Sequence, residues 1–295
     1  MSDGAGGGLN FGDCIGCGLC ILGCPAYEET GFDVLTARGR NKALQSGLAA
    51  GDMVEPIWAC TLCGYCDAIC PSRVRNVDIV LQLRRDLAGQ AIASAPAARA
   101  LVLGCTIRDR APHLIPSITE FLRRIGRPAD LPGDNVDGAE ACCGSLDVEA
   151  GLATPARATA GVVADPICFE QYDAECLGVL AMQHLDLFDL KPPFYYFAPH
   201  RIVNRDHARV YPLYDALRRR YGCDMNLDLN RLARSTSAGS VQGLSGRNSR
   251  DISAAVARLL EHSKAERIIT CSPADYLAFR THSGRETLFI TECLR

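Results

Sequence analysis

The hydrophobic and polar positions of this chain follow one spacing pattern in the first third of the sequence and a different one in the remainder. Residues 26–59 carry few strand signals, and their composition favours helix. Residues 77–87 place apolar side chains at helical spacing beside charges at Arg84, Arg85 and Asp86, which predicts an amphipathic closing helix. The segment 89–98, which contains alanine and proline, indicates a linker. The pattern therefore predicts an α-helical module at residues 1–92.

Beyond the linker, short apolar runs alternate with helical patterns. The runs predict buried strands at residues 100–104, 161–164, 194–198 and 267–270. The helical patterns predict helices at residues 117–125, 177–190, 213–221 and 251–263. Strands and helices that alternate in this way are typical of α/β layers.

The second part of the chain also matches itself when it is shifted by about 95 positions. Residues 101–105 fall on residues 196–200, and Cys142-Cys143-Gly144 falls on Ser237-Ala238-Gly239. After a few extra residues in the second copy, residues 162–168 match residues 268–274. The alternative is that part of this match arises by chance. The repeat predicts two modules of similar fold, at residues 97–190 and 191–295.

Composition narrows the class of protein. The chain has 295 residues, 48% of them hydrophobic, and a net charge of −3, which predicts a soluble globular protein. It lacks the excess of positive charge that is typical of nucleic-acid binding. No stretch reaches the roughly 18 apolar residues that a membrane span needs, so a membrane would have to be reached through a partner subunit. Residues 1–8 lack the features of a signal peptide, and 16 cysteines then indicate metal ligation in a reducing cytoplasm.

Two identical cysteine runs carry the clearest chemistry. Each has the spacing C-x2-C-x2-C-x3-C-P, which holds paired [4Fe–4S] clusters, with the fourth cysteine of each run crossing to the other cluster. We therefore predict two ligand sets. The outer cysteine set is Cys14, Cys17, Cys20 and Cys70, and the inner cysteine set is Cys60, Cys63, Cys66 and Cys24. Disulfides would need an oxidising compartment, and zinc ribbons do not need eight cysteines in this spacing.

A further pattern, Cys105, then Cys142-Cys143-Gly144, then Cys168, resembles the CCG domain, a cysteine-rich module that usually occurs in two copies. Together with the two runs, it is similar to the iron–sulfur subunits of glycolate oxidase and lactate-utilisation enzymes and to the D-type subunit of heterodisulfide reductase. Arg38-Gly39-Arg40, between the runs, resembles the glycolate oxidase type most closely. The resemblance implies an α-helical ferredoxin domain followed by two CCG-type α/β modules.

The chain departs from the CCG pattern in both modules. The first keeps four cysteines, which we call the CCG cysteine set, namely Cys105, Cys142, Cys143 and Cys168. They suffice for one iron–sulfur cluster or one zinc ion, and the third alternative is no metal. Asp165 stands where a cysteine is expected and is either an oxygen ligand or a surface turn residue.

The second module keeps only Cys271, because other residues stand at the remaining ligand positions, namely Ser237, Ala238, Ala274 and Pro199-His200. We expect this module to have lost its metal and to serve as a scaffold, with His200 solvated or hydrogen-bonded. Cys176, Cys223 and Cys293 fit no motif and are expected to be buried as small hydrophobic residues.

These features predict an electron-transfer subunit of a hetero-oligomeric oxidoreductase, with no catalytic residue of its own. In this interpretation, electrons pass between a flavin on a partner, either a 2-hydroxy acid dehydrogenase or a heterodisulfide reductase-like subunit, and a further acceptor. The alternative is a thiol/disulfide-active subunit that uses a cluster at the CCG cysteine set. Cluster potentials span roughly −700 to +450 mV, so the sequence leaves the direction of electron flow open.

Overall fold

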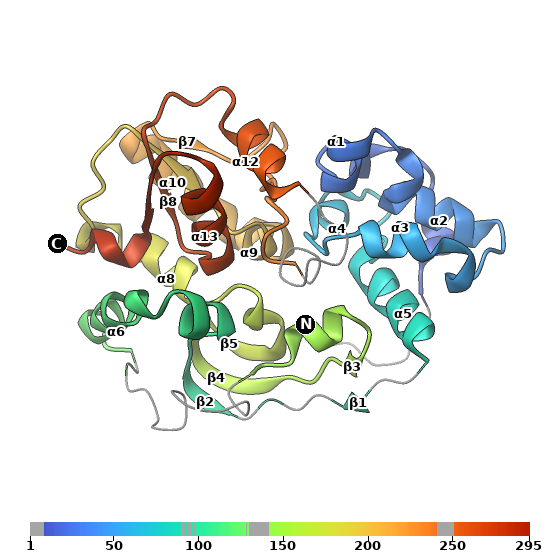
Figure 1. The fold of residues 1–295 in the computed structure, drawn as a ribbon, viewed down its shortest axis with the longest axis horizontal. Helices are drawn as coiled ribbons and strands as arrows, with labels where there is room; N and C mark the ends of the chain where they lie inside the picture. The colour runs from blue at the N-terminus through green and yellow to red at the C-terminus, as the bar shows by residue number, and fades with distance from the viewer. Residues whose placement is uncertain are drawn as a thin grey trace.

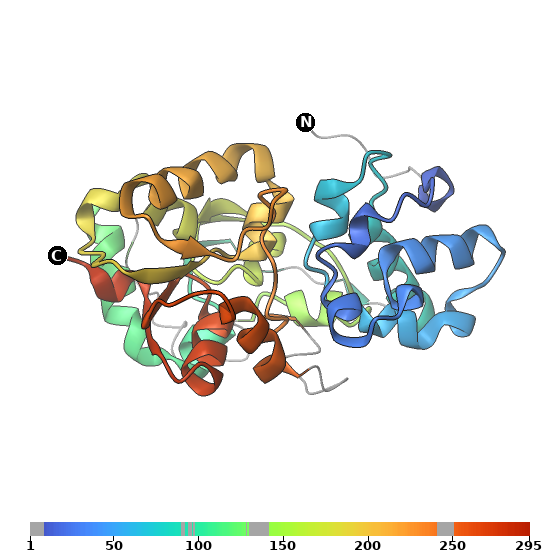
Figure 2. The ribbon, with the colours of Figure 1, turned by 90° about the horizontal axis from the view of Figure 1, so that it is seen from above.

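The computed structural model describes residues 9–89, 92–93, 96, 98–127, 129, 142–240 and 251–295. The N-terminal segment 1–8, which carries the prediction about a signal peptide, lies outside them. Figure 1 shows a helical module at one end of the molecule and two sheets with their helices at the other. Figure 2, viewed from above, shows the same division.

The N-terminal module is helical throughout its described residues, as the sequence predicts. Its α-helices are α1 (Pro25–Thr30), α2 (Ala37–Gln45), α3 (Val54–Ala59), α4 (Tyr65–Ile69) and α5 (Asn76–Ala88). Its 3-10 turns are η1 (Phe11–Asp13), η2 (Leu19–Ile21), η3 (Asp33–Leu35) and η4 (Ala50–Met53). Pro25 occupies the first turn of α1 directly after Cys24, where its missing N–H costs nothing. The proline of the first cysteine run therefore starts a helix.

Gly39 lies between Arg38 and Arg40 because two backbones approach closely there. A Cβ atom at this position would stand 2.5 Å from the Asp33 carbonyl oxygen and 2.6 Å from the Val34 Cα. Only glycine lets α2 pack this tightly on η3. The packing places the two flanking arginines beside the cysteine loops.

The first sheet is parallel and has the order β2 (Arg99–Val102), β4 (Ala158–Val163), β5 (Tyr172–Cys176). Its helices are α6 (Ile115–Arg124), α7 (Ser145–Glu149) and α8 (Leu177–Gln183), and its shorter turns are η5 (Thr106–Arg110), η6 (Pro112–Leu114), η9 (Cys168–Gln171) and η10 (Leu185–Leu187). A separate parallel pair joins β1 (Ile92–Ala93) to β3 (Ala153–Thr154). The predicted linker therefore contains a short strand.

The second sheet is also parallel, with the order β7 (Asp224–Met225), β6 (Phe194–Phe197), β8 (Arg267–Thr270), β9 (Glu286–Phe289). Its helices are α9 (His200–Arg205), α10 (His207–Tyr221), α12 (Ile252–Leu260) and α13 (Pro273–His282), and the chain closes with η11 (Ile290–Cys293). The order β6, β8, β9 repeats the order β2, β4, β5. This parallel order is what two similar modules would give, although the repeat itself stays a prediction.

Two helices have bounds that differ from those that the sequence predicts. The helix predicted at residues 177–190 ends at Gln183, where His184 leaves the helical region with φ −122° and ψ 41°, and a separate 3-10 turn follows. The helix predicted from residue 213 begins at His207 and contains Pro212. Pro212 lies in the second turn of this helix, where it removes the hydrogen bond that its N–H would make to the carbonyl group four residues earlier.

A single hydrophobic core connects the two sheets. It includes Leu101 and Val162 from the first sheet, Tyr196 and Ile269 from the second, and almost every residue of α8. Burial of this kind is the main stabilising term in folding. The two α/β modules therefore form one packed body. None of the helices within the described residues is both long and apolar enough to cross a membrane.

Candidate metal centres

The outer cysteine set converges on one small pocket of the helical module. Cys14, Cys17, Cys20 and Cys70 line it together with Arg38 and Asn41. The Cys17 side chain is exposed, and the neighbouring Ile15 and Leu22 are 70% and 62% exposed. The carbonyl groups of Cys14 and Gly16 accept hydrogen bonds from Lys42 Nζ and Arg38 Nε, each at 3.1 Å. This pocket therefore lies at the surface.

The inner cysteine set lines a second pocket, and Cys20 lies between the two pockets. Cys24, Cys60, Cys63 and Cys66 line this second pocket together with Arg40. Cys24 belongs to the first run and the other three to the second, so the structure gathers the cysteines across the two runs. Cys63 is only 8% exposed. The crossed ligation of two clusters stays a prediction, but the required side chains are in place.

Burial changes the acidity of these thiols. Desolvation raises the pKa of Cys63 to about 12 and that of Cys20 to about 11, and it raises the pKa of Cys66 well above its usual value. Metal ligation requires thiolates, so metal binding must displace protons from these sites. Iron ions attract thiolates strongly, and this attraction would offset the free energy needed to deprotonate the buried thiols.

Two buried arginines lie beside the inner cysteine set, and no carboxylate of the described residues forms an ion pair with either. Arg40 is 3% exposed, and its Nη1 donates to the Leu35 and Pro56 carbonyl groups at 2.8 and 2.9 Å. Arg84 is fully buried and donates to the carbonyl groups of Cys60 (2.5 Å), Glu149 (2.7 Å) and Ile57 (3.2 Å). Among the described residues, no ion pair compensates either charge, and the buried Arg84 Nε has no hydrogen-bond partner. A cluster with four thiolates is anionic and fits these surroundings.

The loop of the inner cysteine set is fixed to the α/β body. Asn204 on α9 donates to the Cys63 carbonyl at 3.0 Å and to the Ala233 carbonyl at 2.9 Å. The Tyr65 hydroxyl donates to Asp228 at 2.5 Å, and Arg234 pairs with Glu28 at 2.6 Å. The inner cysteine set therefore faces the rest of the protein, while the outer set faces away from it.

The CCG cysteine set also comes together. Cys105 follows β2, Cys142 and Cys143 precede α7, and Cys168 follows β4. The Cys143 and Cys168 sulfurs are 3.0 Å apart. Hydrogen bonds from the Cys105 and Cys143 thiols hold the pKa of the exposed Cys142 well below its usual range. The four thiols thus share one site at the carboxyl ends of parallel strands.

The CCG cysteine set is not spaced for a single metal ion. Within the part of the chain that the structure describes, no three His, Cys, Asp or Glu side chains are arranged to hold one. The Cys143 and Cys168 sulfurs are closer together than the thiolates of a zinc site or of an iron–sulfur cluster, so either group would have to move them apart. Zinc, an iron–sulfur cluster and no metal therefore all stay predictions at this set.

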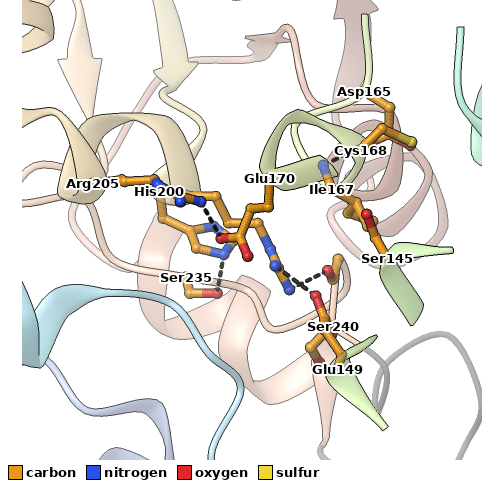
Figure 3. Close-up of polar contacts among 12 residues, drawn as sticks. Ser145, Glu149, Asp165, Ile167, Cys168, Glu170, His200, Arg205, Ser235 and Ser240 are labelled. Atoms are coloured by element: carbon orange, nitrogen blue, oxygen red, sulfur yellow. Dashed lines mark hydrogen bonds and ion pairs between the residues drawn. The ribbon is translucent and has the colours of Figure 1, made fainter. Parts of the chain in front are cut away.

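Asp165 is a buried turn residue and not a surface one. It is 1% exposed, and its Oδ1 accepts a hydrogen bond from the Ile167 N–H at 3.0 Å, one turn before Cys168. Burial raises the pKa of this carboxyl group to about 6. Figure 3 shows Asp165 close to Cys168. The carboxylate thus caps the turn that presents Cys168, and a role as a ligand stays a prediction.

The corresponding positions of the second module are filled by packing. Ala238 and Ala274, at predicted ligand positions, are buried together with Ile167 from the first module in a small apolar cluster. His200 is 4% exposed, and its Nε2 lies 3.2 Å from the Ser235 hydroxyl (Figure 3), so it is hydrogen-bonded and not solvated. Cys271 is buried with its sulfur 3.5 Å from the Tyr196 hydroxyl. The unassigned cysteines are buried as expected, namely Cys176, Cys223 and Cys293.

A cavity of about 350 Å³ opens where the three modules meet, beside Cys63. Its wall includes Arg201 and Arg205, which pair with Glu149 at 2.6 Å and with Glu170 at 2.9 Å. Figure 3 shows the Arg205–Glu170 pair. Arg201 and Arg205 of this wall are therefore each paired with a glutamate.

Comparison with known proteins supports iron–sulfur binding by the helical module, which carries the outer and inner cysteine sets. Residues 10–74 match the 4Fe-4S dicluster domain family. One subunit of the H(2):CoB-CoM heterodisulfide,ferredoxin reductase from Methanothermobacter thermautotrophicus is 35% identical over 98 residues, covering 33% of this chain and 51% of that protein. The glycolate oxidase iron-sulfur subunit of Escherichia coli is 28% identical over 137 residues, covering 42% of this chain and 32% of the relative.

The fumarate reductase iron-sulfur subunit of Haemophilus influenzae is 32% identical over 84 residues, covering 24% of this chain and 32% of the relative. The chain thus spans about half or less of each of these relatives. No solved structure matches it. The predicted resemblance to iron–sulfur subunits of the glycolate oxidase and heterodisulfide reductase type is confirmed, and residues 10–74 match a domain that is described as holding two 4Fe-4S clusters.

Proposed function

We propose that this chain is the electron-transfer subunit of a hetero-oligomeric oxidoreductase. The outer and inner cysteine sets would each hold a [4Fe–4S] cluster, and the CCG cysteine set a third iron–sulfur cluster. When bound, these groups supply one-electron transfer. The partner would carry a flavin, in an assembly of the 2-hydroxy acid dehydrogenase or heterodisulfide reductase type. The relatives support a role as one subunit of several, since they are named as subunits of a heterodisulfide reductase and a glycolate oxidase.

The observation that carries the proposal is the order of the three cysteine sets. The outer set lies at the surface, and the inner set faces the α/β body. Helix α7 begins two residues after Cys143 and ends at Glu149, whose carbonyl accepts a hydrogen bond from Arg84. The same arginine donates to the Cys60 carbonyl. A single side chain thus connects the helix that follows the CCG cysteines to the inner loop, which supports a relay toward the CCG set.

Metal analysis of protein purified without oxygen tests this proposal. With about four irons for each cluster, we expect about twelve irons, equal acid-labile sulfide and no zinc per chain, with EPR signals after reduction. About eight irons would remove the third cluster and end the relay at the inner set. Fewer than about eight, or zinc in place of iron, would contradict the proposal.

One observation favours a second function, thiol/disulfide chemistry at the CCG cysteine set. Cys142 is exposed, and its lowered pKa makes it the thiolate of the group. If this function holds, Cys142→Ser abolishes turnover of a disulfide substrate while dye-linked electron transfer through the helical module persists. If the variant keeps both activities, or the wild type turns over no disulfide, the relay alone accounts for the protein.

A further inference from the structure

The two buried arginines beside the inner cysteine set distinguish its surroundings from those of the outer set. Arg40 lines the same pocket as Cys24, Cys60, Cys63 and Cys66. Arg84, on α5 of the same module, donates to the Cys60 carbonyl and also lies over the Trp58 ring, at 4.7 Å from the centroid. Both guanidinium groups donate to carbonyl oxygens, and no carboxylate of the described residues forms an ion pair with either.

The cations beside the outer cysteine set differ in burial and in pairing. Arg38 is 39% exposed at its side chain and forms an ion pair with Asp33. Lys42 is exposed and donates to Gln45 at 2.7 Å. Water, salt and the Asp33 carboxylate therefore screen the positive charges around the outer set. The charges of Arg40 and Arg84 act through a medium of much lower effective dielectric constant.

Glu149 is bound to Arg84 through its main chain, whose carbonyl accepts a hydrogen bond from the guanidinium group at 2.7 Å. Its carboxylate forms an ion pair with Arg201 at 2.6 Å, and both side chains are 3% exposed. The same carboxylate favours the charged form of Arg84, so it compensates that charge in part. A buried charge that is compensated only in part is costly, so an anion in the adjacent pocket would stabilise this arrangement.

We propose that Arg40 and Arg84 are the counter-charges of the inner cluster and keep it reducible although it is buried. This inference rests on the proposed function. Reduction adds one negative charge to a group that is already anionic, and burial alone disfavours that addition. Two nearby buried positive charges oppose the penalty, because potentials depend on charge and hydrogen bonding around the cluster. Both arginines are thus positioning residues for electron transfer.

Redox titration of the holo-protein, followed by EPR, tests the inference. The signals are assigned with Cys17→Ser for the outer set and Cys66→Ser for the inner set. In Arg40→Gln and Arg84→Gln, we expect the ratio of reduced to oxidised inner cluster at a fixed potential to fall tenfold or more. A tenfold change is about 59 mV for one electron. The outer cluster should shift much less, and Arg38→Gln should leave the inner cluster unchanged.

The charge-keeping variants Arg40→Lys and Arg84→Lys separate charge from structure. If charge acts, they retain most of the wild-type inner potential, or retain inner iron where the glutamine variant loses it. An unchanged inner potential in both fully loaded glutamine variants would overturn the inference. So would lysine variants that shift or lose iron as much as their glutamine counterparts. Wild-type protein without clusters would instead refute the proposed function.

Discussion

At the scale of single residues, burial departs from the sequence pattern where a charged side chain occupies an apolar position. Arg84, Arg85 and Asp86 together suggest the charged face of α5, yet Arg84 is fully buried. It follows Val80 by four residues, so it lies on the same buried face of the helix. Its helical position predicts burial, but only the neighbouring cysteine loop explains why a charge is tolerated there. Arg40, within Arg38-Gly39-Arg40, is a similar case.

His200 gives a prediction at this scale. Burial lowers its pKa to about 3, whereas an unfolded histidine titrates near about 6.5. Between these values the unfolded chain binds more protons, so stability falls as pH falls from about 6.5 towards 3. From about pH 7 to about pH 5.5, we expect the wild type to lose about 1.3 kcal/mol more than His200→Gln.

Denaturant unfolding at the two pH values measures this difference. His262→Gln, at an exposed position, is the matched control and should retain the wild-type pH dependence. An identical pH dependence in wild type and His200→Gln would contradict the prediction.

At the scale of elements, the sequence predicts those helices and strands whose apolar pattern is undisturbed. β8 has the predicted bounds Arg267–Thr270, and the closing helix α5 differs by one residue at each end. β5 (Tyr172–Cys176) and β9 (Glu286–Phe289) have no prediction, because both carry charged residues, with Asp173 and Glu286 exposed at their positions. Register and neighbouring strands, which arise only in the folded protein, define such strands.

The candidate metal centres, too, could be predicted from the sequence only where the signal is local. Cysteine spacing is local, so it predicts which side chains meet in the outer and inner pockets. The groups around them come from distant segments and have no signal in the sequence: Asn204 lies 141 positions after Cys63, and Glu149 lies 65 positions after Arg84. Such contacts require the tertiary structure.

Helix α9 provides the prediction at this scale. Asn204 is buried and donates to the Cys63 and Ala233 carbonyl groups, and its Oδ1 accepts from the Ala233 N–H at 2.8 Å. Asn204→Ala leaves buried backbone groups without partners, so we expect a loss of about 1–3 kcal/mol in the free energy of unfolding. The inner cluster should also release iron to a chelator faster than in the wild type.

Iron release followed by EPR, with unfolding in denaturant, checks both effects. Asn230→Ala is a suitable control, because Asn230 is exposed and its side chain makes a long, 3.4 Å contact with the Tyr65 hydroxyl. Equal release rates from the inner set in wild type and Asn204→Ala would count against a supporting role for α9.

At the scale of the whole molecule, buried contacts across module boundaries make one body of the chain. Arg201 on α9 pairs with Glu149 on α7 at 2.6 Å and donates to the Gly239 carbonyl at 2.8 Å. Ile167 from the first module packs against Ala238 and Ala274 of the second. The second module, with a single cysteine at the predicted ligand positions, thus supports the CCG cysteine set.

The Arg201–Glu149 pair provides the prediction at this scale. Arg201→Met or Glu149→Gln leaves a buried charge without its partner, so each should cost about 3–5 kcal/mol in the free energy of unfolding. The double variant should cost clearly less than the sum, because neither charge then remains. A double-mutant cycle in denaturant measures the coupling.

The exposed pair of Lys191 and Asp189, at 71% and 51% side-chain exposure, is the control, and its removal should cost about 0–1 kcal/mol. Strictly additive losses at Arg201 and Glu149 would mean that the buried pair does not join the modules energetically.

The unequal exposure of the two cysteine pockets has a consequence for how the proposed holo-protein would decay in air. Oxygen reaches Cys17 and the surrounding loop directly, whereas the inner loop is covered by α9 and Arg84. The carbonyl groups of the outer loop at Cys14 and Gly16 are held from α2, within the same module. Oxidative damage would therefore begin at the outer set and leave a folded protein cut off from its redox partner. Such a chain would keep its fold but would no longer transfer electrons.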